Sequence, residues 1–235
     1  MIKQVVVFCL LICFILGTIV PFGWAIEGAI EEEATKQEAK VIKAIEVLKK
    51  IASREGQSGA FAALLGQARG IVIFPRLTQV GLGVGVRFGE GIILRRDPSS
   101  NRWYGPGFLE MRAASVGPQI GMQEVSLILL LMSEQAVRDF TRDEFQVEAG
   151  LNITPGPLGD ALKAGFDFSS DVYSYSYSEG LYAGFTLGGS WIAEDDKANH
   201  YFYQREISNR EILSRMTPQN RYVLELVELI RKISR

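Results

Sequence analysis

The segment from Val80 to Arg96, VGLGVGVRFGEGIILRR, constrains the fold more than any other part of the chain. A dinucleotide-binding fingerprint requires G-x-G-x-x-G directly after a strand and at the start of a helix. Here Val86 or Phe88 stands in the place of the third glycine, and no helical pattern follows. The residues alternate instead between an apolar face and a glycine face. The apolar face consists of Leu82, Val84, Val86 and Phe88, and the glycine face of Gly81, Gly83, Gly85 and Gly89 with Arg87. We therefore predict a β-strand with one bare face, and no nucleotide site.

The same alternation places Gly117 with Gly121, and Gly184 with Gly188, on single faces of two further segments. Repeated glycine on one face permits sharp bending and close packing over a sheet. From Gly70 onward, short apolar segments are separated by glycine, proline and turn residues, a pattern typical of antiparallel strands. The sequence thus predicts an α+β fold, with a strongly curved, largely antiparallel, barrel-like sheet flanked by N-terminal and C-terminal helices.

A strong helical pattern runs from Glu31 to Ala52. Its apolar residues fall on one stripe, formed by Val41, Ile45, Leu48 and Ala52. Four lysines fall together on the opposite side: Lys36, Lys40, Lys43 and Lys50. A second clear helix is expected near the C-terminus, with Thr217 as its N-cap. The first helix is therefore predicted to be amphipathic with a basic outer face.

Residues 1–25 have the organisation of an export signal: an early lysine, an apolar run from Val5 to Val20, and small residues at Gly23 and Ala25. We expect cleavage after Ala25 and one domain over residues 26–235. The protein would then be exported, and periplasmic or associated with the cell envelope. An uncleaved membrane anchor and a lipoprotein are the alternatives. Both cysteines lie in the apolar run, so a cleaved chain has no thiol chemistry.

Residues that would carry catalysis or bind metal are scarce. The sequence has no G-x-S-x-G motif, and its one histidine, His200, has no neighbouring histidine or cysteine to complete a zinc site. The acids from Glu194 to Asp196 fit a helix N-terminus. A formal net charge of −2 argues against nucleic-acid binding. We predict a protein that is not an enzyme and has no catalytic residue, metal or cofactor, with basic clusters as its remaining candidate sites.

Six segments taken together, in this order, resemble the SYLF domain, a lipid-binding and actin-binding module: ARGIVIFP, GVRFGEGIILRRD, SVGPQIGMQEVSLILLLMSEQAV, GPLGD, VYSYSYSEGLYAGFTLGGS and YFYQREISNREIL. The similarity covers roughly residues 43–213. It implies a single domain that binds phosphoinositides or other anionic phospholipids, with a contribution from the N-terminal basic helix.

The resemblance implies that the candidate lipid-binding residues on this helix are Lys36, Lys40, Lys43 and Lys50. The residue pattern adds Arg95 and Arg96 as candidates. The expected partner is an anionic membrane surface, because export removes actin as a natural partner. The alternative from another class is an envelope scaffold that binds protein and no lipid. Binding to acidic vesicles that is lost at high salt distinguishes the lipid-binding module from the protein-binding scaffold.

Overall fold

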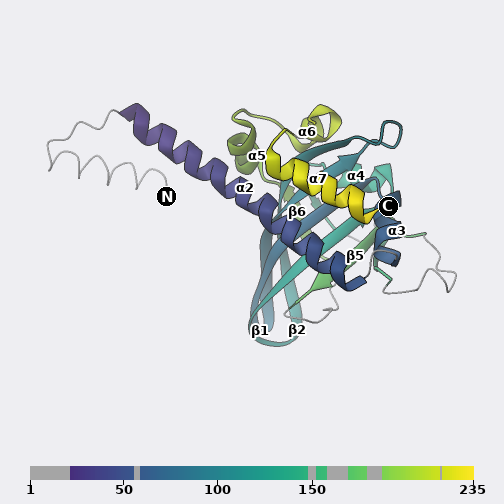
Figure 1. Cartoon of the computed structure of the whole chain (residues 1–235). Helices are drawn as coiled ribbons and strands as arrows, with labels where there is room; N and C mark the ends of the chain where they lie inside the picture. The colour runs from purple at the N-terminus through teal and green to yellow at the C-terminus, as the bar shows by residue number, and fades with distance from the viewer. Residues whose placement is uncertain (1–21, 56–58, 148–151, 158–168, 179–186, 218) are drawn as a thin grey trace.

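The computed structural model describes residues 22–55, 59–147, 152–157, 169–178, 187–217 and 219–235 (Figure 1). Most of the predicted export signal lies outside these residues. The described elements are, in chain order, α2 (Phe22–Glu55), α3 (Ala60–Gln67), β1 (Gly70–Arg96), β2 (Trp103–Leu131), α4 (Glu134–Asp139), β3 (Glu144–Gln146), β4 (Ile153–Pro155), β5 (Val172–Tyr177), β6 (Ser190–Glu194), α5 (Asp196–Tyr203), α6 (Asn209–Arg215) and α7 (Arg221–Ile233).

Strand β2 is the centre of the sheet. It pairs with β1 along its whole length, with β6 through residues 109–113 and with β5 through residues 126–131. The strand order is β3-β6-β2-β5-β4, with β1 also paired to β2. All of these pairs are antiparallel except β4 with β5. The predicted α+β class and largely antiparallel curved sheet are confirmed.

The hairpin of β1 and β2 is a long ribbon that folds back on itself. The apolar segments expected to form separate short strands are continuous here, from Gly70 paired with Leu131 to Arg96 paired with Trp103. The two halves of β1 approach each other so closely that the amide of Arg96 donates a hydrogen bond to the carbonyl of Arg69, at 2.8 Å. The ribbon therefore bends back at the lower end of β1 and β2 in Figure 1, and its register also shifts at three points, between Phe74 and Leu77, between Leu82 and Val84, and between Ile93 and Arg95.

Glycine makes this bend possible. A Cβ atom on Gly85 would lie 2.2 Å from the Val80 carbonyl oxygen, and one on Gly91 would lie 2.7 Å from the Ile73 carbonyl oxygen. Real Cβ atoms do not approach backbone oxygens so closely. The bare face predicted from the sequence thus packs against the other half of the same strand.

Away from the bend, both faces of the sheet are covered. Ile71 and Ile128 point into one apolar core, which they share with α2, α3 and α7. Their neighbours Val72 and Leu129 point into a second core, which they share with α4 and α6. This two-sided burial explains the continuous apolar run of β2, since a strand buried on both faces needs no polar alternation.

Helix α2 lies across the sheet and extends beyond it at its N-terminal end (Figure 1). The predicted apolar residues Val41, Ile45 and Leu48 are buried. The buried arc is wider than the sequence indicated, since Val47 and Ile51 are also buried, and α5 and α7 pack on α2 in addition to β1. Within the described part of the chain, no helix combines the length and apolarity needed to cross a bilayer.

Helix caps decide the remaining boundaries. Ser133 caps α4, with its hydroxyl oxygen accepting the amide hydrogen of Ala136 at 3.0 Å. The prediction that Thr217 caps the last helix is wrong. Asn220 takes that role, because its side-chain oxygen accepts the amide hydrogen of Tyr222 at 2.9 Å.

Candidate functional site

Two of the four predicted lysines are engaged by acidic side chains of the chain itself. The ammonium of Lys36 lies 2.5 Å from Glu33 Oε1, which raises the pKa of Lys36. The ammonium of Lys40 lies 2.7 Å from Glu90 and 3.4 Å from Asp195, and its side chain is only 16% exposed. Lys40 therefore ties α2 to β1 and to the start of α5.

The other two lysines lie on an exposed face of α2. Lys43 and Lys50 form no ion pair with any described residue. The ammonium of Lys50 is 4.1 Å from the ring centroid of Tyr177, and the guanidinium of Arg54 is 4.5 Å from the same centroid. Positions 43, 50 and 54 fall within one narrow arc of an α-helix. We call Lys43, Lys50 and Arg54 the α2 basic cluster.

Sequence reasoning missed Arg54 because it ended the helix at Ala52, whereas α2 continues to Glu55. The i, i+4 spacing from Lys50 to Arg54 was the available signal. Tyr177 belongs to the segment VYSYSYSEGLYAGFTLGGS, whose pattern gives no sign of a contact with α2. Its place beneath two cations depends on β5 lying beside α2, which no local pattern shows.

Arg95 and Arg96 hold other parts of the fold. Arg95 lies 3.4 Å from Glu134 of α4 and donates a hydrogen bond to the carbonyl of Leu213 in α6. Arg96 donates to the carbonyl of Gly66 in α3. The structure therefore places the two arginines against α3, α4 and α6, and not beside the lysines of α2.

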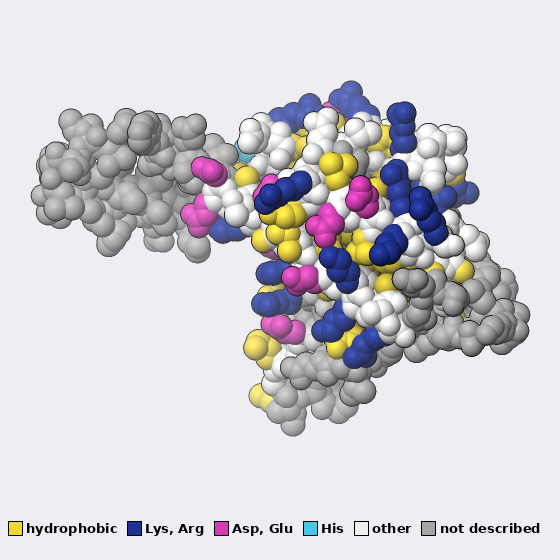
Figure 2. All heavy atoms as spheres, in the orientation of Figure 1, with side chains coloured by type: hydrophobic (Ala, Val, Ile, Leu, Met, Phe, Trp, Pro, Cys, Tyr) yellow, Lys and Arg dark blue, Asp and Glu magenta, His cyan; other side chains and the backbone are white. Residues whose placement is uncertain are grey.

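A second exposed feature is the bend of the ribbon, which we call the ribbon tip and define as residues 77–89 and 113–123. Large hydrophobic side chains are exposed there: Val80 41%, Leu82 76%, Val84 68%, Val86 56%, Phe88 48% and Met122 71%. Hydrophobic spheres are visible at this lower end of the molecule in Figure 2. The apolar face recognised in the sequence is thus the outward face, because the glycine face is used for the fold-back.

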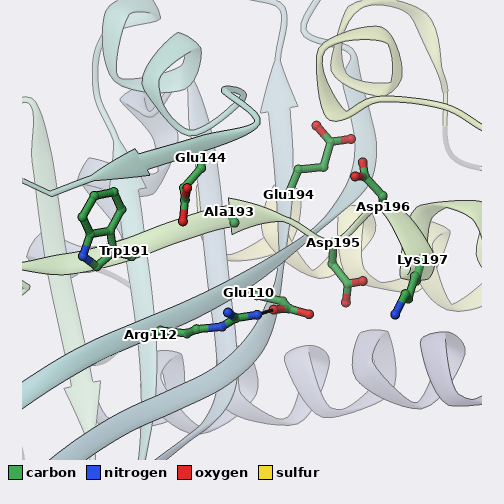
Figure 3. Close-up of a pocket in the computed structure, with 9 residues that line it drawn as sticks. All are labelled: Glu110, Arg112, Glu144, Trp191, Ala193, Glu194, Asp195, Asp196 and Lys197. Carbon is green, nitrogen blue, oxygen red and sulfur yellow. Dashed lines mark hydrogen bonds and ion pairs between the residues drawn. The ribbon is translucent and has the colours of Figure 1, made fainter. Parts of the chain in front are cut away.

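A pocket of about 280 Å³ beside β6 and the start of α5 is acidic (Figure 3). It is lined by Glu110, Arg112, Glu144, Trp191, Ala193, Glu194, Asp195, Asp196 and Lys197. Burial raises the pKa of Glu194 to about 7. Its Oε1 accepts hydrogen bonds from the Asn209 amide at 2.5 Å and the Asn199 side chain at 2.9 Å.

The acids of this pocket have structural partners. Asp195 caps α5 by accepting the amide hydrogen of Ala198, as the sequence predicted for acids at a helix start. Glu110 lies 2.6 Å from Arg112. The described residues contain no group of three side chains able to hold a metal ion. The contacts of these acids thus hold β6 to α5 and α6. The exposed basic and apolar surfaces remain the candidate binding site.

Comparison with known proteins agrees with the sequence resemblance. Residues 112–233 match the model of a family described as Ysc84, Las17-binding protein actin regulator. The human SH3 domain-containing YSC84-like protein 1 is 30% identical over 202 residues, which cover 83% of this chain and 58% of that protein. Protein YSC84 of Saccharomyces cerevisiae is 32% identical over 156 residues, which cover 64% of this chain and 33% of that protein. The chain therefore spans less than two thirds of these relatives.

Proposed function

Because the chain belongs to the Ysc84 family, as its resemblance to SYLF domains predicted, we propose that it is a non-enzymatic module that binds anionic phospholipid surfaces. The observation that carries the proposal is the α2 basic cluster. Lys43 and Lys50 are exposed on one face of α2, two turns apart, and neither forms an ion pair with a carboxylate of the described residues. Arg54 lies over the same aromatic ring as Lys50.

The arrangement of charge along α2 supports this proposal. Acidic side chains engage the lysines of its N-terminal half, Lys36 and Lys40. The C-terminal half, from Lys43 to Arg54, carries four cations and one acid. Cations close to an anionic membrane contribute about 1 kcal/mol each, within about 10 Å of the surface at ordinary salt. Three cations on one face are therefore worth about 3 kcal/mol, although the whole chain is slightly acidic.

The ring of Tyr177 positions two of these cations. Lys50 and Arg54 both lie over it, so two like charges are held near each other. Like charges in proximity repel, and an anion placed between them removes that repulsion. A lipid phosphate supplies such an anion, and the aromatic ring suits the interface between water and lipid.

A protein partner is the second candidate, and the family description favours it because that description names Las17 binding and actin regulation. We also propose export to the cell envelope, on the pattern of residues 1–25. In that location an anionic leaflet is available, and cytoplasmic actin is not.

Vesicle sedimentation tests the proposal. The full chain is mixed with vesicles of phosphatidylcholine alone, or of phosphatidylcholine with phosphatidylglycerol in equal parts. We expect binding to the acidic vesicles that weakens as salt is added. The triple variant Lys43→Gln, Lys50→Gln, Arg54→Gln should bind these vesicles about 100-fold more weakly. The apolar run of residues 5–20 is common to all variants, so its contribution cancels in the comparison.

The matched control is Lys49→Gln. Lys49 neighbours Lys50 but pairs with Glu225 at 3.0 Å on another face of the helix. We expect a change of about twofold or less in the control, against about fivefold for Lys50→Gln alone. Equal binding of the triple variant and the parent to acidic vesicles would contradict the proposal.

A further inference from the structure

We propose that the ribbon tip inserts into the boundary between headgroups and acyl chains of the membrane that the α2 basic cluster binds. This inference rests on the proposed function and adds a second, apolar contact site to it. The site consists of the outward side chains of residues 80–88 of β1 together with Met122 of β2.

Exposed apolar side chains are concentrated at the tip. Among the described residues, eight large hydrophobic side chains are exposed, and six of them belong to the tip. The other two, Trp191 and Leu224, stand on β6 and α7. Contiguous apolar surface of this kind indicates an interaction site, whereas single exposed side chains need no explanation.

The tip also lacks charges that lipid contact would have to desolvate. Residues 77–89 contain one charged side chain, Arg87, and residues 113–123 contain none. The guanidinium of Arg87 donates to Gln79 Oε1 at 2.7 Å and 2.9 Å, on the inner face of the ribbon. Charged side chains begin beyond the tip, with Arg76 lying 3.4 Å from Glu124 across the two strands.

Backbone pairing is present on both sides of the apex of the tip, where the register shifts between Leu82 and Val84. Gly81 pairs with Gly121, Leu82 with Ile120 and Val84 with Val116. Backbone groups that are paired in this way need no water partner when the strands meet lipid. The fold-back leaves no interior to the tip, since glycine backbones fill it, so the apolar side chains point outward.

The tip and the α2 basic cluster are placed to act together. Tyr177, which lies beneath Lys50 and Arg54, is the register partner of Ser126 on β2. Met122 is four residues further along the same strand, about 13 Å away at 3.3 Å per residue. Interfacial segments bury their apolar face about 5–10 Å deep. A tip at that depth leaves the basic cluster near the level of the lipid phosphates.

The chemistry of the tip favours lipid over a protein partner. Its outward residues are mainly aliphatic, and they project from a convex bend. Protein interfaces rely on tryptophan, tyrosine and arginine anchors that fill pockets. None of these residue types is on the outward face of the described tip.

A label at the tip reports insertion directly. In the full chain with Cys9 and Cys13 replaced by serine, Val84→Cys carries a polarity-sensitive fluorophore, and Leu224→Cys carries it in the control. We expect a blue shift and quenching by a lipid-soluble quencher at position 84 on adding the acidic vesicles, and neither change at position 224. A label at position 84 that stays in water on vesicle-bound protein overturns the inference and leaves the proposed function standing.

Two further outcomes are decisive. If the parent chain does not bind acidic vesicles, both the proposed function and this inference fail. If the label at position 84 becomes buried without vesicles as protein concentration rises, the tip binds a second copy and the inference is overturned.

As an affinity test, Leu82→Ser with Val84→Ser should weaken vesicle binding at least about tenfold at every salt concentration, and Leu224→Ser should not. Unchanged binding by the double variant also refutes insertion.

Discussion

Replacing Gly91 by alanine tests the fold-back of the ribbon, on which the proposed tip depends. Gly91 lies in the second half of β1, opposite Leu109 of β2. A Cβ atom there would lie 2.5 Å from Cδ1 of Phe74 and 2.7 Å from the carbonyl oxygen of Ile73. Phe74 is fully buried, and Ile73 is fixed by its pairing with Ile128. Neither neighbour has room to move aside.

The expected cost follows from these contacts. Overpacking a rigid site destabilises a protein by about 1–3 kcal/mol, and the upper part of that range applies because backbone must shift. Replacing glycine by alanine also removes unfolded-state entropy, which returns about 0.4–1 kcal/mol. We therefore expect Gly91→Ala to lower the free energy of unfolding by about 2 kcal/mol. The control is Gly188→Ala, because no atom lies within 4 Å of a Cβ built there.

Urea unfolding followed by tryptophan fluorescence measures both variants. With a denaturant slope of about 2 kcal/mol per M, the midpoint of Gly91→Ala should fall by about 1 M at unchanged slope. The midpoint of Gly188→Ala should stay close to that of the parent. If both variants unfold at the parent's midpoint, the two halves of β1 are not in contact, and the folded ribbon is wrong.

Two further predictions concern charged groups, and both use urea unfolding. Lys40→Gln should lower the free energy of unfolding by about 1–2 kcal/mol, because it leaves the buried Asp195 without its cation. Lys36→Gln removes an exposed pair and should leave the urea midpoint close to that of the parent. Equal effects of the two variants would contradict the internal role of Lys40. Burial raises the pKa of Glu194 from 4.5 to about 7, so the folded state binds this proton more tightly than the unfolded state does. The resulting stabilisation of the folded state is full below pH 4.5 and is lost as the pH rises through about 7. The Glu194 side chain is only partly buried, which limits the loss to about 1–2 kcal/mol. Glu194→Gln should remove that part of the pH dependence, so an unchanged pH profile would refute the prediction.

Much of the fold was predictable because local periodicity reports local structure. The alternation of Leu82 and Val84 with glycine predicted a strand, and the spacing of Val41, Ile45 and Leu48 predicted the buried face of α2. The sequence did not show that the short apolar segments join into two long strands. Glycine, proline and turn residues between these segments were read as boundaries, whereas the ladder continues, for example through Gly89 paired with Met111.

The candidate site was predicted only in part. All four lysines lie on α2, but the structure separates Lys40, which is partly buried and paired with Asp195, from Lys43 and Lys50, which stay exposed. That difference depends on a carboxylate 155 residues further along the chain. Arg54 joined the cluster because the helix continues one turn beyond its predicted end and meets Tyr177.

The sequence by itself determined the elements, the glycine face of β1 and the lysine side of α2, since each depends on residues a few positions apart. Only the tertiary structure decided which of these faces meets solvent. The glycine face of β1 is bare enough for backbone to pack on backbone, so the ribbon closes through it. The apolar side chains of the bend are then left outside, with nothing in the described chain to cover them. Burial is a property of what packs against a face, and those partners come from distant parts of the chain.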